Sequence, residues 1–509
     1  MTRVDELPSE VLLNVCRQLR EGSSEDVGDK DQASIQINAQ TTATSYRQLA
    51  LTNRSLCPPA RESLFKSIVL GYPPPSPNPF HTTHNGVSNL AFHSVTRIMS
   101  MSAANTPLSP IDFLLRTLLE NQEYGTKIED MTLFLPNLFT AHCDNYYLFQ
   151  EEPRSSRAQA LSTMLGEVAR YITTFDLLPS EEYTWISALQ NDYPYSLVGV
   201  LLSLAPNLKR LSIFILPESE RRKPFTIAYP NGRPISYLVK FFGCSPTTIS
   251  TNIAATRALQ NLHWLKFDGC SLGIDMHGLQ YCPKLTHLAL VPRARERVDF
   301  PRDWNPPTCD TEFLATQKRS LANITYLRIN FSSLGTQAHT WADPWSPPQV
   351  QFLSLFPKLA HLDANATITY KKIFAANPHL YDNLETLRLD SPNLRLINPI
   401  LVLPAFTFVS KLTVPHIAVH TPRSRMFVEL PPSIQYLRLL DARDDAFKYL
   451  ERVLQDRLVG EYEDLRKFEV VFRKSIPKSR VNAMKNRTVR RDVSFWTAVV
   501  ASGIEVSVE

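Results

Sequence analysis

Residues 262–272 read Leu-His-Trp-Leu-Lys-Phe-Asp-Gly-Cys-Ser-Leu, and the spacing of their apolar residues decides the fold of this 509-residue chain. Leu262, Leu265 and Phe267 form a six-residue pattern, apolar-x-x-apolar-x-apolar. The last two apolar residues are two positions apart, so they would lie on one face of a β-strand. The first would turn the chain into that strand from the preceding corner. The stretch therefore predicts a short strand with one buried face.

The same pattern recurs along most of the chain. Its copies are named here by their first apolar residue: Leu208, Leu262, Leu285, Ile324, Leu359, Leu384, Val409, Ile434 and Leu465, with weaker copies at Phe65 and Ile128. Those at 359, 384, 409 and 434 start 25 residues apart, and the longer intervals must hold inserts. One such unit cannot bury its own apolar face, so the repetition predicts a stacked array.

Apolar segments before some copies predict the other half of each unit. Leu197–Leu204 and Val350–Phe356 have the apolar content of helices that would pack on the strands. Pro206, Pro283 and Pro357 stand just before the next copy and would end such a helix. The expected fold class is therefore α/β, a solenoid of strands and helical connections.

The quoted stretch resembles the leucine-rich-repeat family, with Cys270 at that family's Asn/Cys position. The observed steps fall within the family's period of about 20–29 residues. Ser332 and Pro392 occupy the same position in other copies, so the repeats are irregular. The resemblance implies a horseshoe solenoid whose concave strand face binds another protein.

The N-terminal segment has a different character. Leu7–Val15 reads Leu-Pro-Ser-Glu-Val-Leu-Leu-Asn-Val, with proline near a helix start and aliphatic residues at helical spacing. Residues 20–45 are polar and predict a flexible loop. Leu49–Leu56 then begins a second helical stretch, which leads into the weak copy at Phe65.

These features, together with Asn53–Ser55, resemble the F-box, which docks a protein onto the Skp-family adaptor of cullin-RING ubiquitin ligases. Leu56 stands where the F-box usually has tryptophan, and the polar loop lengthens the module. The resemblance implies a small all-α module whose adaptor-binding residues are Leu7, Pro8, Val11, Leu12, Leu49 and Leu51. A small helical cap on the solenoid is the alternative reading.

The composition changes predict three regions. Residues 1–70 would form the F-box-like module with its inserted loop 20–45, and residues 71–127 a Pro-rich spacer and helical insert. Residues 128–509 would form the irregular solenoid, with a basic segment at 473–491.

The third and fifth positions of each copy would point away from the core, towards the face that meets a partner. Aromatic residues and arginine recur there, and both are enriched at interface hot spots. We predict a basic and aromatic binding face, although an ordinary solvated strand face is an equal alternative. The predicted substrate-binding residues are Trp264, Lys266, Tyr326, Arg328, His361, Arg388, Tyr436 and Arg438.

The sequence argues against several other classes of protein. A count of 54 Lys and Arg against 49 Asp and Glu is too balanced for a general nucleic-acid binder. With 38 Pro and only 15 Gly, the chain is a poor candidate for a nucleotide enzyme. The apolar stretches 197–205 and 400–409 are too short to span a bilayer. The seven cysteines are scattered, which favours a cytoplasmic or nuclear location.

No motif for catalysis stands out. The chain lacks Gly-x-Ser-x-Gly, a Gly-rich phosphate loop and His-Glu-x-x-His. His81 and His84 have a spacing that a metal could use, but no third ligand lies near them in the sequence. Cys270 and Cys282 stand near histidines, yet a cysteine in a repeat core is usually a small hydrophobe. We therefore predict that the protein is not an enzyme and has no metal or cofactor.

The expected function follows from the two resemblances together. The chain would be the substrate-recognition subunit of a Skp–cullin–F-box ubiquitin ligase, a monomer within that larger complex. Its partners would be the Skp-family adaptor, through it a cullin, and a protein substrate. The alternative is a repeat scaffold for protein interactions without any link to the ligase.

Overall fold

The structure is a computed structural model, and its described residues form two compact units, with unit 1 ending at Leu285 and unit 2 starting at Thr286. It describes residues 57–71, 110–135, 156–175, 177, 179–191, 193–215, 241–242, 257–268, 279, 281–291, 321–330, 352–365, 370–390, 400–421, 426–443, 446–472 and 493–508. Each unit is described by itself.

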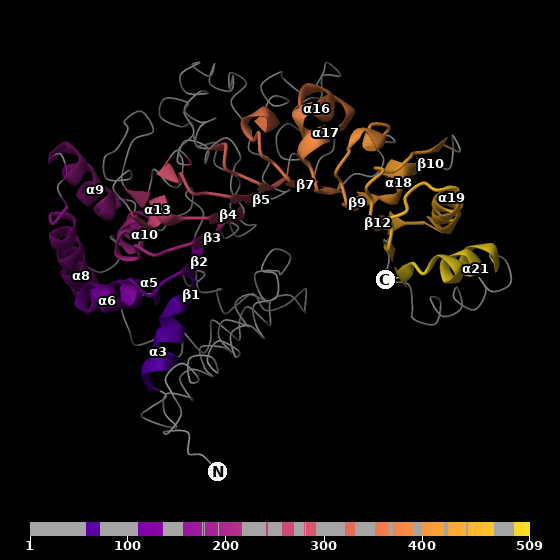
Figure 1. Cartoon of the computed structure of the whole chain (residues 1–509). Coiled ribbons are helices and arrows are strands. Elements are labelled where there is room, and N and C mark those ends of the chain that lie inside the picture. Colours follow the sequence, from indigo (N-terminus) through magenta and orange to yellow (C-terminus); the bar gives the residue numbers. More distant parts are fainter. Residues whose placement is uncertain are drawn as a thin grey trace, which may run out of the picture. The chain divides into compact units, whose positions relative to one another are not determined.

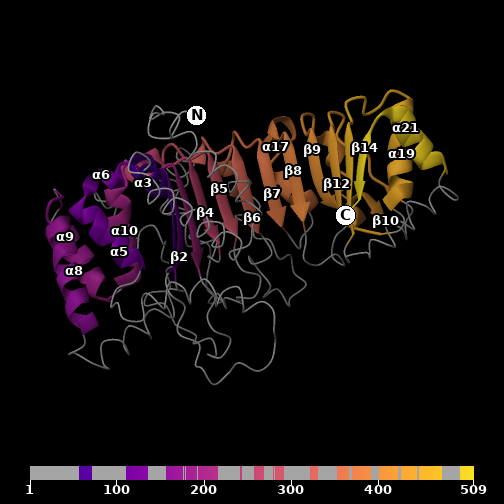
Figure 2. The same cartoon turned by 90° about the horizontal axis from the view of Figure 1, so that it is seen from below.

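Unit 1 contains a parallel sheet in which the strands lie in sequence order (Figure 2). The strands are β1 (Ser67–Gly71), β2 (Asp130–Leu135), β3 (Arg210–Ile215) and β4 (Trp264–Asp268). Equivalent positions of the sequence pattern pair with one another, as in Met131 with Leu211 and Leu211 with Leu265. These leucines are fully buried, so the pattern sets the register as well as the buried face.

The helices of unit 1 bury apolar stripes against one another and the sheet. In α5 the residues Ile111, Leu115 and Leu118 are buried at helical spacing. In α10 the apolar run Leu197–Leu204 lies almost entirely in the core, which confirms the helix predicted there. The helices are α3 (Cys57–Lys66), α5 (Pro110–Glu120), α6 (Gln122–Gly125), α8 (Ser156–Ile172), α9 (Pro179–Asn191), α10 (Tyr193–Leu204) and α13 (Arg257–Asn261) (Figure 1).

Two of the few glycines allow backbones to touch in unit 1. A Cβ on Gly125 would stand 1.9 Å from the carbonyl oxygen of Leu204, and one on Gly199 would stand 2.0 Å from that of Phe241. Because both obstacles are backbone atoms, no side-chain movement could relieve the clash. Glycine is therefore required where α6 meets α10 and where α10 meets Phe241.

Unit 2 contains a longer parallel sheet built in the same way. Its strands, in spatial order, are β5 (His287–Val291), β6 (Tyr326–Asn330), β7 (His361–Asn365), β8 (Thr386–Asp390), β9 (Lys411–Pro415), β12 (Tyr436–Ala442), β13 (Lys467–Phe472) and β14 (Glu505–Val508). A separate antiparallel pair joins β10 (His420–Thr421) to β11 (Met426–Phe427). In β8 the burial alternates along the strand, with Leu387 and Leu389 in the core.

The connections of unit 2 are shorter than those of unit 1. They contain η5 (Phe352–Leu355), α16 (Tyr370–Ala376), α17 (His379–Asn383), η7 (Leu403–Ala405), α18 (His416–Val419), α19 (Ala446–Leu458) and α21 (Val493–Ser502). Of the helix predicted at Val350–Phe356, the described residues form the 3₁₀ turn η5, and residues 350 and 351 lie outside them.

A recurring backbone motif joins one coil to the next in both units. Two consecutive N–H groups donate to a single carbonyl oxygen of the preceding coil, at the point where the strand begins. Lys209 and Arg210 both donate to Glu129 O, at 2.8 and 3.0 Å, and Gln435 and Tyr436 both donate to Ser410 O, at 2.8 and 2.9 Å. The solenoid is therefore held by bonds between neighbouring coils, as expected for a repeat protein.

The described residues form an α/β fold with parallel sheets and solenoid-like repetition, as predicted. The sheet of unit 1 starts at Ser67, because β1 pairs with β2 from Ser67 opposite Asp130. It therefore begins before residue 128, where the solenoid was predicted to start, and includes residues assigned to the N-terminal module. That module up to residue 56, most of the spacer and the basic segment 473–491 lie outside the described residues.

No helix in the described ranges is both long and apolar enough to cross a membrane.

Candidate functional site

The third and fifth positions of each copy lie on one face of the strands, here called the variable face. In unit 2 the strand pairing lines these positions up in two rows that run across the sheet. The third-position row is His287, Tyr326, His361, Thr386, Lys411, Tyr436, Lys467 and Glu505. The fifth-position row is Ala289, Arg328, Asp363, Arg388, Thr413, Arg438, Glu469 and Ser507.

Ion pairs between neighbouring strands occupy the fifth-position row. Asp363 forms ion pairs with both flanking arginines, with its carboxylate 3.3 Å from Arg328 Nε and 3.8 Å from Arg388 Nε. Arg438 Nε stands 3.6 Å from Glu469, whose carboxylate also accepts the hydroxyl of Tyr436. The carboxylates thus neutralise much of the arginine charge. The two rows of the variable face of unit 2 thus hold five Lys and Arg side chains and three carboxylates, with part of the basic charge in ion pairs.

Aromatic rings occupy the start of the third-position row. The rings of His287 and Tyr326 stack with centroids 5.5 Å apart, and His361 lies on the far side of Tyr326 at 6.4 Å. All three residues are half-buried, so part of each ring is accessible. Together they form an aromatic strip of the kind that contacts protein partners.

The variable face of unit 1 is chemically different. Lys266 is only 3% exposed, and its ammonium lies 3.7 Å from Asp268 and 4.8 Å from the centre of the Phe214 ring. Phe214 stacks in turn on Phe134 at 4.9 Å, and both rings are buried. The middle of this face is therefore part of the core of unit 1. Its third positions, where the strands start, are more exposed to solvent.

The third positions of unit 1 carry a second cation–π pair. The guanidinium of Arg210 lies 4.7 Å from the ring centre of Trp264 and 4.0 Å from Asp130. Arg210 is exposed and Trp264 is half-buried, so the pair is accessible at the rim of the sheet.

The structure divides the predicted substrate-binding residues between the two units. Trp264 and Lys266 lie on β4 in unit 1, and the other six lie on β6, β7, β8 and β12 in unit 2. Six predicted residues thus share one sheet, with Tyr326, Arg328 and His361 on adjacent strands. Lys266 differs from its predicted position, because its side chain is buried rather than presented to a partner. The predicted adaptor-binding residues lie outside the described residues.

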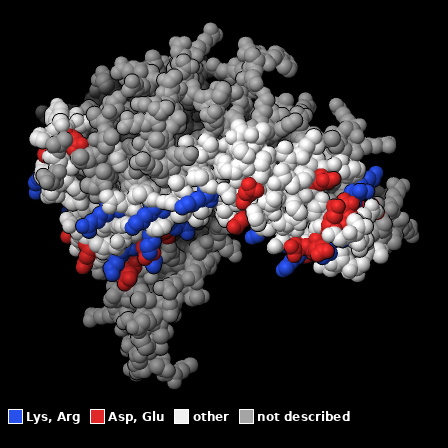
Figure 3. Space-filling model, turned by 45° about the horizontal axis from the view of Figure 1, so that its top comes forward, with Lys and Arg blue, Asp and Glu red and all other residues white. Residues whose placement is uncertain are grey.

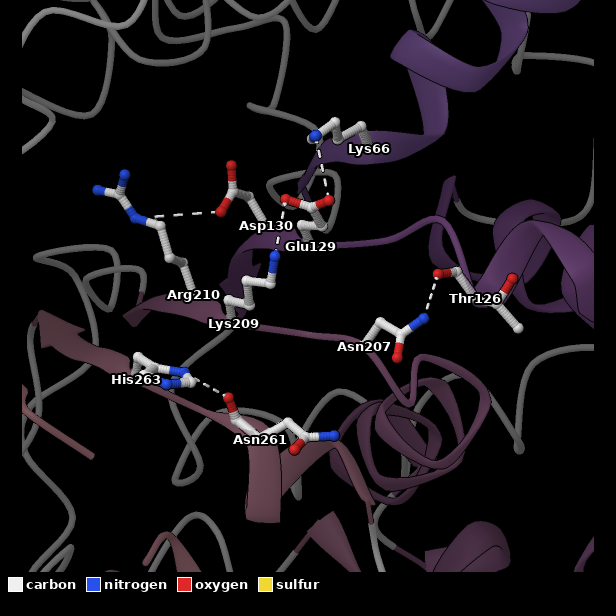
Figure 4. A network of polar contacts seen from close by, with 9 residues as sticks. All are labelled: Lys66, Thr126, Glu129, Asp130, Asn207, Lys209, Arg210, Asn261 and His263. Atoms are coloured by element: carbon white, nitrogen blue, oxygen red, sulfur yellow. Dashed lines mark hydrogen bonds and ion pairs between the residues drawn. The ribbon is translucent and has the colours of Figure 1, made fainter. Parts of the chain in front are cut away.

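A polar cleft of about 480 Å³ opens at the edge of unit 1 where the strands begin (Figure 4). It is lined by Glu62, Lys66, Thr126, Lys127, Glu129, Asn207, Lys209, Asn261 and His263. Most of the charged lining comes from the second position of the pattern, the residue just before each strand. Sequence reasoning missed these residues because it considered only the third and fifth positions.

Glu129 is the centre of the cleft's charge network. Its two carboxylate oxygens lie 3.1 Å from Lys66 Nζ and 3.4 Å from Lys209 Nζ (Figure 4). Burial alone would raise the pKa of Glu129, but the hydrogen bonds and charges of the two lysines outweigh it and lower that pKa below its usual value. Glu129 is therefore ionised at neutral pH and holds both ammonium groups in place.

Asparagine side chains fix the wall of the cleft. Asn207 Nδ2 donates to the carbonyl of Thr126 at 2.7 Å, and Asn261 Nδ2 donates to that of Pro206 at 3.0 Å. In unit 2, Asn383 Nδ2 donates to Pro357 O at 2.8 Å in the same way. The signal in the sequence was an asparagine directly before the first apolar residue of a copy.

No group of three or more His, Cys, Asp or Glu side chains among the described residues is placed to hold a metal ion. Cys282 is fully buried, and burial raises the pKa of its thiol to about 12, so it is not a nucleophile at neutral pH. The clustered polar groups of the cleft and the variable face are suited to binding.

Comparison with known proteins places the chain in no family. No protein-family model matches it, and no curated protein matches it significantly.

Proposed function

We propose that the chain is a protein-binding repeat protein that acts as the substrate receptor of a Skp–cullin–F-box ubiquitin ligase. The variable face of unit 2 would hold the substrate, and the N-terminal segment would hold the adaptor. Holding both on one chain raises the effective concentration of substrate lysines near the ligase.

The proposed binding of a substrate rests on one observation. The partly accessible strip of His287, Tyr326 and His361 lies beside the triad of Arg328, Asp363 and Arg388. It joins an aromatic surface to a charged lattice on one rigid sheet. Aromatic residues and arginine supply most hot-spot energy in protein interfaces. The lattice also fixes the arginines, so less side-chain entropy is lost on binding.

The ligase half rests on the F-box-like residues of the N-terminal segment. Its test is co-purification of the full chain with the Skp-family adaptor, compared between the natural sequence and a Leu7→Ala, Pro8→Ala double variant. Leu458→Ala is the matched control, because Leu458 is 70% exposed in unit 2. We expect the double variant alone to lose the adaptor while its circular dichroism spectrum stays unchanged.

The substrate half is tested separately. Proteins captured by the natural chain would be compared with those captured by a Tyr326→Ala, His361→Ala variant, with Lys358→Ala as the control on the same unit. Loss of a specific protein only in the aromatic variant supports the proposal. If a partner is bound through unit 2 but no adaptor co-purifies, the chain is a scaffold without a ligase link.

A further inference from the structure

We propose that the polar cleft of unit 1 is a binding site for a single carboxylate group of a protein partner. The site lies at the edge of the sheet and not on the variable face. It does not depend on the ligase link, because none of its lining residues is among the predicted adaptor-binding residues.

The charge of the lining determines the sign of the ligand. Three lysines face two glutamates in the cleft, with His263 as a further polar group. Glu129 is paired with Lys66 and Lys209, whereas Glu62 forms only a long ion pair with Lys127. A cationic ligand would have to displace a lysine from Glu129, whereas an anionic ligand meets one positive charge in excess. On the left of the view in Figure 3, Lys and Arg side chains form a row on the surface, with Asp and Glu side chains beside them.

The donors that would hold the ligand can be named. Lys127 Nζ lies 4.0 Å from Glu62, beyond hydrogen-bonding distance, so this contact leaves its N–H groups available. An ammonium has three donors, and Lys209 directs one of them to Glu129. Both lysines line the cleft, and a carboxylate that reached both would receive a charge-assisted hydrogen bond from each.

The excess charge also favours a carboxylate over a phosphate. One negative charge neutralises the lining, whereas a dianion would bring its second charge close to Glu62 and Glu129. The asparagines supply a rigid wall, since Asn207 is bonded to Thr126 and Asn261 accepts from Lys284 Nζ at 2.8 Å. The cleft is thus preorganised for a small, singly charged group.

The test is binding of short blocked peptides to the full chain, followed by NMR saturation transfer. A peptide with one central glutamate, its glutamine counterpart and its phosphoserine counterpart would be compared. A Gly-only peptide with a free C-terminus distinguishes a chain-end carboxylate from a side-chain carboxylate. We expect saturable binding of the glutamate peptide, the free-C-terminus peptide or both, and none of the glutamine peptide.

Three variants assign the binding to the cleft. Lys127→Met with Lys209→Met should weaken binding at least about tenfold, since two charge-assisted hydrogen bonds are lost. Lys358→Met should leave it unchanged, because Lys358 pairs with Asn323 in unit 2. Glu62→Gln removes an exposed carboxylate and should tighten binding.

A glutamine peptide that binds as tightly as the better of the two carboxylate peptides would overturn the proposal. So would a double lysine variant that is folded and retains its affinity, or a phosphoserine peptide that binds more tightly than the carboxylate peptides. Because the adaptor test uses other residues, either proposal can fail while the other stands.

Discussion

The variable faces of the two units are built by the same sequence pattern but differ in their chemistry. In unit 1 the centre of this face is apolar and buried, with Lys266 packed on Phe214 and Phe214 on Phe134. In unit 2 the fifth positions form a half-buried lattice of ion pairs around Asp363 and Glu469. Strand register is therefore common to both units, whereas the use of the variable face is set by the residues at the fifth and seventh positions.

This difference has an energetic consequence. Truncating a buried side chain on the variable face of unit 1 should remove core packing, whereas truncating a more exposed side chain there in unit 2 should cost less stability. Three matched comparisons between the units test this contrast.

The largest effect is expected at the seventh position. Phe214→Ala in unit 1 removes a fully buried ring and should lower the free energy of unfolding by about 3–5 kcal/mol. Leu440→Ala, at the seventh position of β12, should cost only about 1 kcal/mol, because Leu440 is half-buried. Denaturant unfolding followed by circular dichroism measures both, and equal losses would abolish the contrast.

An intermediate effect is expected for lysine. Lys266→Met leaves Asp268 without its buried partner and should cost roughly 2–3 kcal/mol. Lys411→Met, on the exposed third position of β9, should change stability by less than about 0.5 kcal/mol. The shift in the urea midpoint distinguishes the two variants. A stabilised Lys266→Met protein would mean that Asp268 is hydrated and the pair unimportant.

The smallest effect is expected from Glu129 and depends on pH. Its pKa is lower in the folded chain than its usual value of 4.5, so its pairing stabilises the fold above pH 4.5. This contribution is lost as the pH falls through the folded pKa. The difference in stability between the natural chain and Glu129→Gln should therefore shrink between pH 7 and pH 3. A difference that grows on acidification would show that the sign of the pKa shift is opposite.

Much of the fold could be predicted from the sequence because apolar spacing dictates strand faces. The nine strong copies all contain the strands of the structure, and the weaker copies at Phe65 and Ile128 contain β1 and β2. The strand β14 was missed, although Ile504, Val506 and Val508 alternate in the same sense. The six-residue pattern also requires an apolar residue at its first position, upstream of the strand. A short strand that lacks this residue gives little signal.

Less of the candidate site could be predicted, for a physical reason. Position in the pattern gives the direction of a side chain but not what a neighbouring coil places beside it. Arg388 was predicted to bind a substrate, and the spacing alone did not show that Asp363 on the adjacent strand lies 3.8 Å from its Nε. Lys66, Glu129 and Lys209 are separated by long inserts in the sequence and meet only because β1, β2 and β3 pair in order.

The asparagine bonds between coils have a consequence for how such a chain can change over time. Asn207, Asn261 and Asn383 each tie a corner to a backbone carbonyl of the coil before it, independently of the residue types there. The connection between two corners can then lengthen or shorten without shifting either strand. Insertions and deletions should accumulate between coils, while the strands and their corners keep a constant length.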